Sequence, residues 1–302
     1  MLIWGTTWAV IRVGLRGIPP LTGVALRFAL ASAALLGVAP LLGVKLGRSR
    51  IERRLWWANA LLTFCIPYSI LYWAEQWVPS GLSAVIFSTF PLLTALGAHF
   101  VLPAERLTLR SVGGIVLGFA GVAVIFSEDF HALGGVQVAK AAALLLISPT
   151  CAALGNVTVK RWGGDLHPVS TAAVPMGITA LLVGALALLT ESGKAVTFNT
   201  PSILSILYLA LIGSALPFTL YFWLLRHTSA TNLSMINYAT PILAVIVGSL
   251  FLGEAFTPRI LAGSALVLVG VGVAVTKRAA GVKAKRSEAP EGAAVESPSE
   301  PA

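Results

Sequence analysis

Charged side chains are scarce in this sequence of 302 residues, in which Asp, Glu, Lys and Arg together make up 11%. A soluble domain carries roughly 25% charged residues, so this chain lacks the charges that would cover a water-facing surface. Hydrophobic residues make up 57%, and the mean hydropathy is +0.86. The composition excludes an ordinary soluble domain and predicts a protein that crosses a membrane many times.

Patterns for disulfides and metal sites are also missing. The two cysteines, Cys65 and Cys151, both lie in apolar runs, and the four histidines are scattered without metal-ligand spacing. Pairing the cysteines would require two helices in contact, so small apolar packing is the favoured role. We predict no metal site and no cofactor.

Acidic residues are absent from the middle of every long apolar run; Glu75, Glu105 and Glu254 all lie at the ends of such runs. A membrane-embedded enzyme would need acid, base or metal groups clustered at one membrane face, and none are visible. A proton-coupled carrier usually keeps a buried carboxylate or histidine in its transport path. The sequence offers no obvious one, so coupling to an ion is left open.

Long apolar runs dominate what is present, and a membrane span needs ~20 such residues. These runs predict an all-α integral membrane protein with ten transmembrane helices. The first run begins at residue 1, so we expect the natural chain to start about ten residues further upstream. The predicted spans cover about 1–18, 20–44, 55–74, 80–102, 111–127, 137–159, 169–190, 203–225, 229–252 and 259–276.

The net charge of +9 is unevenly placed along the chain. Lys and Arg gather in the loops after even-numbered spans and in the tail, which predicts that these loops and both termini are cytoplasmic. We expect a multi-pass protein of the plasma (cell inner) membrane and no nucleic-acid partner. The tail, 277–302, turns from basic to acidic and is predicted to be disordered. The loop after the second span shows the bias, with Lys45, Arg48, Arg50, Arg53 and Arg54.

The chain repeats itself at a shift of 150 places. "LLTFCIPYSILYWAEQW" (61–77) aligns with "LIGSALPFTLYFWLLRH" (211–227), so that Pro67 matches Pro217. The same shift matches Pro91 with Pro241. Each copy, 1–127 and 137–276, holds five predicted spans. Because five is odd, the second copy starts on the opposite side of the membrane, and inverted repeats of this kind are typical of secondary transporters.

Three stretches, "WGTTWAVIRVGLRGIPPLTGVALRFALASAALL", "TFPLLTALGAHFVLPAERLT" and "ATPILAVIVGSLFLGEAFT", resemble the EamA-type families of the drug/metabolite transporter superfamily. The resemblance covers both repeats, about residues 1–276. It implies a ten-helix inverted-repeat fold with cytoplasmic termini and the export of small metabolites, amino acids among them. The short first helix departs from the family pattern.

Four prolines, Pro67, Pro91, Pro217 and Pro241, interrupt predicted spans in matched pairs. Each frees the carbonyl four residues earlier, which must then find a partner or water inside the membrane. Polar and aromatic residues lie beside them, which suggests a central cavity for a solute with an apolar body and a few polar groups. The predicted substrate-binding residues are Trp4, Thr7, Tyr68, Tyr72, Ser88, Pro91, Asn156, Tyr221, Asn237, Tyr238 and Pro241.

Packing is the competing interpretation for several of these residues, because a buried amide such as Asn156 or Asn237 can join helices. Arg27, the one full charge well inside a span, is interpreted as structural, with its guanidinium reaching outward or towards freed carbonyls. Gly114, Gly121, Gly263 and Gly270 are interpreted as sites of close helix contact.

A secondary transporter that exports a small metabolite, amino-acid-like or otherwise amphipathic, by alternating access is the leading functional hypothesis. A membrane channel and a membrane-embedded enzyme are the alternatives. The expected partners are a small-molecule substrate and the lipid bilayer, with a homodimer left open. Substrate identity, direction of flux and coupling are not determined by these patterns.

Overall fold

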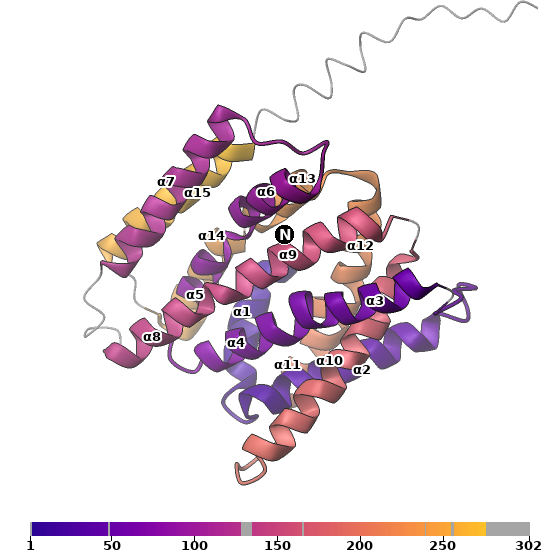
Figure 1. Cartoon of the computed structure of the whole chain (residues 1–302). Coiled ribbons are helices and arrows are strands. Elements are labelled where there is room, and N and C mark those ends of the chain that lie inside the picture. Colours follow the sequence, from indigo (N-terminus) through magenta and orange to yellow (C-terminus); the bar gives the residue numbers. More distant parts are fainter. Residues whose placement is uncertain are drawn as a thin grey trace, which may run out of the picture.

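The computed structural model describes residues 2–47, 49–127, 135–164, 166–238, 240–254 and 257–275; for Met235, Tyr238 and Val275 it describes the backbone alone. The regular structure of these residues is all helical, without a strand (Figure 1). The predicted disordered tail, 277–302, lies outside the described residues.

Within the described residues, seven helical segments are long and apolar enough to cross a membrane, and two shorter apolar helices follow them. Large apolar side chains are exposed on these segments, for example Phe100 at 78% and Leu189 at 82%. Such surfaces suit lipid and not water, which confirms the predicted all-helical membrane class. The seven segments are Pro20–Val38, Arg50–Ala74, Ser80–Val101, Leu109–Phe126, Val136–Trp162, Pro168–Thr190 and Thr200–His227.

The helical elements all lie in or beside the predicted spans, but several spans are divided into shorter pieces. The span predicted for 20–44 ends early, at Val38, ahead of a turn in which Gly43 has a φ of 63°. The elements are α1 (Leu2–Gly14), α2 (Pro20–Val38), α3 (Arg50–Asn59), η1 (Ala60–Cys65), α4 (Ile66–Ala74), α5 (Ser80–Phe87), α6 (Phe90–Val101), α7 (Leu109–Phe126), α8 (Val136–Leu145), α9 (Ile147–Trp162), α10 (Pro168–Thr190), α11 (Thr200–Leu207), η3 (Tyr208–Ala215), α12 (Leu216–His227), α13 (Ala230–Ser234), η4 (Met235–Tyr238), α14 (Thr240–Leu252) and α15 (Pro258–Val275).

The matched prolines explain where the spans divide. Pro67 and Pro217 each follow a segment of π-helix, η1 and η3, and each stands in the first turn of the next α-helix. In η1 the N–H of Ile66 donates to the carbonyl of Leu61, five residues earlier, and η3 ends with the equivalent bond. A wider helical turn accommodates the proline ring and its missing donor.

Helices α7 and α15 run side by side at one edge of the molecule (Figure 1). A Cβ added to Gly121 would lie 2.6 Å from the carbonyl oxygen of Gly263, and one on Gly263 would lie 2.7 Å from that of Gly121. Gly114 and Gly270 also meet the backbone of the opposite helix. The predicted role of these glycines in close helix packing is confirmed.

Several contacts between helices of the two halves have a counterpart in which the matched helices have changed roles. Helix α1 packs against α14, just as α9 packs against α6, and α1 contacts η3 just as α9 contacts η1. Helices α2 and α10, which hold equivalent places in the two halves, pack against each other. The helices that divide at proline thus surround α1 and α9 near the middle of the molecule.

Candidate functional site

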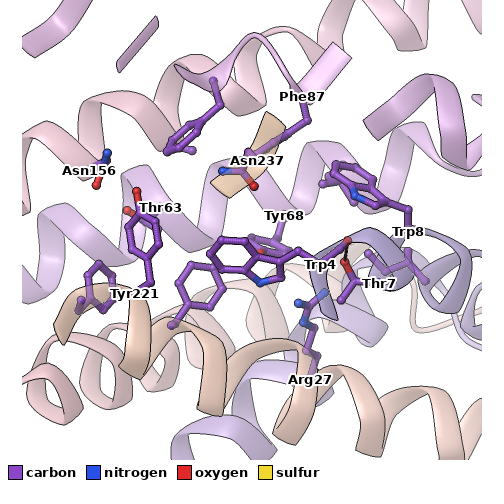
Figure 2. Close-up of a pocket in the computed structure, with 16 residues that line it drawn as sticks. Trp4, Thr7, Trp8, Arg27, Thr63, Tyr68, Phe87, Asn156, Tyr221 and Asn237 are labelled. Atoms are coloured by element: carbon purple, nitrogen blue, oxygen red, sulfur yellow. Dashed lines mark hydrogen bonds between the residues drawn. The ribbon is translucent and has the colours of Figure 1, made fainter. Parts of the chain in front are cut away.

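A cavity lies where the divided helices meet α1, α2 and α9 (Figure 2). It contains about 720 Å³ of space that no atom fills, including the part open to the outside. Its lining residues are Trp4, Thr7, Trp8, Ile11, Arg27, Thr63, Tyr68, Leu71, Phe87, Phe90, Ala152, Asn156, Phe218, Tyr221, Phe222 and Asn237.

Half of the residues that line the cavity are aromatic. The indole of Trp4 lies 5.4 Å from the ring of Phe218 and 5.7 Å from that of Tyr221, measured between ring centroids. Trp8 meets Phe87 edge-on at 5.5 Å. Because these rings come from both halves of the chain, the cavity offers flat apolar surfaces to a solute that lies between the halves.

Arg27 is the charged residue in this lining, and it is 1% exposed. Its Nε donates to the Ser214 hydroxyl at 2.7 Å, and its Nη2 donates to the Gly213 carbonyl at 3.2 Å. That carbonyl is the one that Pro217 frees. The expectation that Arg27 bonds a freed carbonyl is therefore confirmed, although its side chain also reaches the cavity.

Several polar atoms in the cavity wall have no hydrogen-bond partner among the described residues. They include both amide atoms of Asn156, the hydroxyls of Tyr221 and Thr63, and the indole nitrogen of Trp4. The Tyr221 hydroxyl lies near the Asn156 amide, but no hydrogen bond of normal geometry joins them. Buried polar groups usually have partners, so a solute or water in the cavity is the candidate partner for these atoms.

The predicted site residues fall into three groups. Trp4, Thr7, Tyr68, Asn156, Tyr221 and Asn237 all line the cavity. Tyr72 instead lines a smaller neighbouring cavity, which Arg27 also borders. Ser88, Pro91 and Pro241 are outside the lining, and the side chain of Tyr238 lies outside what the structure describes.

Local hydrogen bonds occupy a polar group of two residues that the sequence placed at the site, the hydroxyl of Ser88 and the backbone carbonyl of Asn237. The Ser88 hydroxyl donates back to the carbonyl of Val85 at 2.5 Å. The carbonyl of Asn237, expected to be left unpaired by Pro241, accepts a bond from the Thr240 hydroxyl at 2.8 Å. The unpaired-carbonyl argument for Asn237 is therefore wrong, because the side chain one residue before the proline replaces the missing donor.

Other lining residues were not in the predicted set, notably Thr63, Phe87, Phe90 and Arg27. Thr63 carried a usable signal, because it stands four residues before Pro67. Phe87 carried the same signal, because it stands four residues before Pro91. Phe90 had none, since aromatic residues inside apolar helices most often pack in the core.

Away from the cavity, two arrangements that we call the Glu254 clamp and the Glu105 clamp join the halves. In the Glu254 clamp, the carboxylate accepts bonds from the N–H groups of Ser80 (2.7 Å) and Gly81 (3.1 Å), at the start of α5. Arg12 lies 3.8 Å from the same carboxylate. Arg12 also donates to the Val78 carbonyl at 2.7 Å, so it ties α1 to the loop before α5.

The Glu105 clamp has the same construction with the halves exchanged. Its carboxylate accepts bonds from the N–H groups of Ala230 (2.9 Å) and Thr231 (3.0 Å), at the start of α13. Lys160, the counterpart of Arg12, donates to the Leu225 carbonyl at 2.8 Å. Both clamps use a carboxylate at a helix N-terminus, where the helix dipole favours negative charge.

Glu75 adds a carboxylate to the first clamp that the second clamp lacks. Its carbonyl accepts a bond from Arg12 at 3.1 Å, as the carbonyl of Leu225 does from Lys160. The Glu75 side chain is 1% exposed, and neither carboxylate oxygen has a hydrogen-bond partner among the described residues. Glu75 follows the last residue of its span. Burial raises the pKa of this carboxyl well above its usual range; Arg12 opposes the shift, Glu254 adds to it, and Arg27 opposes it.

No group of three or more His, Cys, Asp or Glu side chains that could hold a metal ion occurs within the described ranges.

A family model described as "EamA-like transporter family" matches residues 1–127 and 139–276. The uncharacterized inner membrane transporter YedA of Escherichia coli is 31% identical, over 85% of this chain and 81% of its own. A "Probable amino-acid metabolite efflux pump" of Salmonella typhimurium is 27% identical, over 90% of each chain. The uncharacterized transporter YvbV of Bacillus subtilis is also 27% identical, over 92% of this chain and 89% of its own.

The same fold occurs in a solved crystal structure that covers 95% of this chain and 96% of its own, with a TM-score of 0.69 and 21% sequence identity.

Proposed function

Because this chain belongs to the EamA-like transporter family, we propose that it is a secondary transporter that exports a small amphipathic metabolite across the plasma membrane by alternating access. We further propose ten membrane crossings, arranged as two inverted five-helix repeats with both termini in the cytoplasm. The distribution of Lys and Arg supports this orientation.

The pair of clamps is the observation that carries this proposal. Each clamp joins the start of one proline-divided span to the end of its partner span, and the two clamps lie at opposite ends of the same helix pair. Opening one clamp while the other holds would expose the cavity at one face only. This is the behaviour that an alternating-access carrier requires and that a channel does not.

The cavity supports a solute of amphipathic character. Its aromatic walls suit an apolar body, and the unpartnered polar atoms of Asn156 and Tyr221 suit hydrogen-bonding groups. The name of the Salmonella typhimurium relative refers to amino-acid metabolites, and an amino-acid derivative would combine both features.

A metabolite screen followed by counterflow tests the proposal. Cells with and without the protein are compared for metabolites that they retain or release, and the candidates are then loaded into proteoliposomes that contain the purified chain. For a carrier, unlabelled solute on one side accelerates the entry of labelled solute from the other. Flux without such acceleration would indicate a channel, and the absence of flux for every candidate would contradict the proposal.

A further inference from the structure

We infer that the solute carries a negative charge, and that Arg27 receives its anionic group inside the central cavity. This inference rests on the proposed transport function and adds to it the chemical class of the solute. The class is an organic carboxylate with an aromatic or other apolar body.

Arg27 contacts only neutral groups. Its guanidinium donates to the hydroxyl of Ser214 at 2.7 Å, to the carbonyl of Gly213 at 3.2 Å and to the hydroxyl of Tyr72 at 3.4 Å. Its central carbon lies 4.7 Å from the centroid of the Tyr68 ring. A guanidinium has more N–H donors than these three contacts use, so donors remain for a bound group.

The charge of Arg27 lacks an anionic partner at bonding distance. The lining of the cavity contains no Asp or Glu. Glu75 acts on Arg27 only through space, without a hydrogen bond or an ion pair between them in the described part of the chain. A buried cation without a bonded anion is costly, and a carboxylate from a solute would offset that cost.

A purely structural role does not account for the charge. A neutral donor could also satisfy the Gly213 carbonyl and the Ser214 hydroxyl. The second half of the chain tests this point, because α10 begins at Pro168 as α2 begins at Pro20, and the residue matched to Arg27 is Pro175. The second half therefore builds its equivalent helix without a cation, so the fold does not require one at this place.

The far side of the cavity complements an anionic head group at Arg27. In Figure 2, Asn156 lies at the upper left and Arg27 below and to the right of the centre, with the indole of Trp4 between them. Asn156 and Tyr221 supply the unpartnered polar atoms there. A solute with a carboxylate at one end, a flat apolar middle and a hydrogen-bonding group at the other would contact all three regions.

Matched pairs of compounds separate charge from shape. The purified full-length chain in detergent is heated with phenylacetate, indole-3-acetate, benzoate or hexanoate, and with the corresponding neutral amides. We expect at least one carboxylate to raise the melting temperature while its amide, at the same concentration, does not. Equal stabilisation by the members of every pair would overturn the inference, as would the absence of a shift with all four carboxylates.

Two substitutions locate the effect. Arg27→Gln should lower the affinity for the active carboxylate at least about tenfold, because a charged hydrogen bond is lost. Arg27→Lys keeps the positive charge but loses the planar guanidinium, so it should retain part of the affinity for the carboxylate. Undiminished affinity in Arg27→Gln would overturn the inference. If Arg27→Gln does not fold, the melting-temperature shifts of the unsubstituted protein with carboxylates and with amides test the inference without it.

Binding in detergent does not depend on transport, so the two hypotheses fail differently. Selective binding of carboxylates without counterflow would contradict the transport proposal and leave the anion site standing. Counterflow of the neutral amides at the same rate as their carboxylates would contradict the anion site and leave transport standing.

Discussion

Glu105 and Glu254 each cap the start of the membrane span that ends just before the other. The carboxylate of Glu254, after α14, accepts the first N–H groups of α5, and the carboxylate of Glu105, after α6, accepts those of α13. Each span of this antiparallel pair is thereby held at its start by the residue that follows its partner. The two attachments are chemically alike, because each is a carboxylate that accepts two backbone N–H groups.

Weakening one clamp should expose the cavity on one face. In a background with Cys65→Ser and Cys151→Ser, the lining residue Ala152 is replaced by cysteine and labelled with a membrane-impermeant maleimide. We expect Glu254→Gln to increase labelling from outside the cell and Glu105→Gln to increase labelling from the cytoplasmic side, because each substitution removes one charge-assisted cap. Changes in the same direction for both variants would contradict the clamp model.

Asn237→Leu should strongly reduce transport while membrane abundance and the melting temperature stay nearly unchanged. Leucine keeps the volume of the side chain but removes the amide that faces the cavity. Asn232→Leu is the matched control, since Asn232 lies outside the lining. Intact transport with lowered abundance in Asn237→Leu would show that the amide joins helices and does not contact solute.

Two adjacent glycines should respond oppositely to alanine. A methyl group on Gly114 would collide with the backbone of Ala274, whereas one on Gly113 would have nothing within 4 Å. Gly114→Ala should therefore destabilise the protein by about 1–3 kcal/mol, as overpacking does. Gly113→Ala should gain up to about 1 kcal/mol from its better helix propensity. Thermal unfolding in detergent measures both, and equal effects would contradict close packing of α7 against α15.

The buried carboxyl of Glu75 should make stability depend on pH. Because its pKa is raised in the folded protein, its contribution is fully present below the ordinary carboxyl pKa of about 4.3. The contribution is lost as the pH rises through the raised value, where the buried group must ionise. The melting temperature of the natural chain should therefore fall from about pH 5 to about pH 8 more steeply than that of Glu75→Gln.

Glu52→Gln is the control for that measurement, because the Glu52 carboxylate accepts a bond from the Ser170 hydroxyl at 2.6 Å. We expect that Glu52→Gln does not raise the melting temperature at high pH, relative to the natural chain, as Glu75→Gln does. Parallel pH profiles for Glu75→Gln and the natural chain would contradict the assignment of a neutral buried carboxyl at Glu75.

Reporter fusions test the orientation in the membrane. A reporter that is active only in the cytoplasm should function when fused after Lys277 and when inserted in the 45–54 loop, because Lys and Arg are retained on that side. Activity of a reporter restricted to the outer side at either position would contradict the inverted arrangement of five spans in each half.

Local patterns were enough to establish the class of the protein. Runs of apolar residues predicted the helices, because a backbone in lipid must satisfy its hydrogen bonds internally. The matched prolines marked where spans divide, because proline lacks a backbone N–H and so removes a hydrogen bond from the helix in which it stands. The spacing of Gly114, Gly121, Gly263 and Gly270 places small residues on one face of each helix, which indicated close helix contact. The cavity residues Asn156 and Asn237 were visible as amides in apolar surroundings.

Contacts between distant residues depended on the tertiary structure. Tyr68 and Tyr72 stand one turn apart and gave equivalent signals, yet they border different cavities. Their rings lie about 6 Å apart along the helix axis, so each meets different neighbours. Glu254 appeared only as a charge at a helix end, and its partners lie more than 170 residues away. The direction of the Arg27 side chain was open for the same reason. Its sequence neighbours place it within a predicted span, but only the packing of η3 against α2 gives its guanidinium the Gly213 carbonyl as a partner.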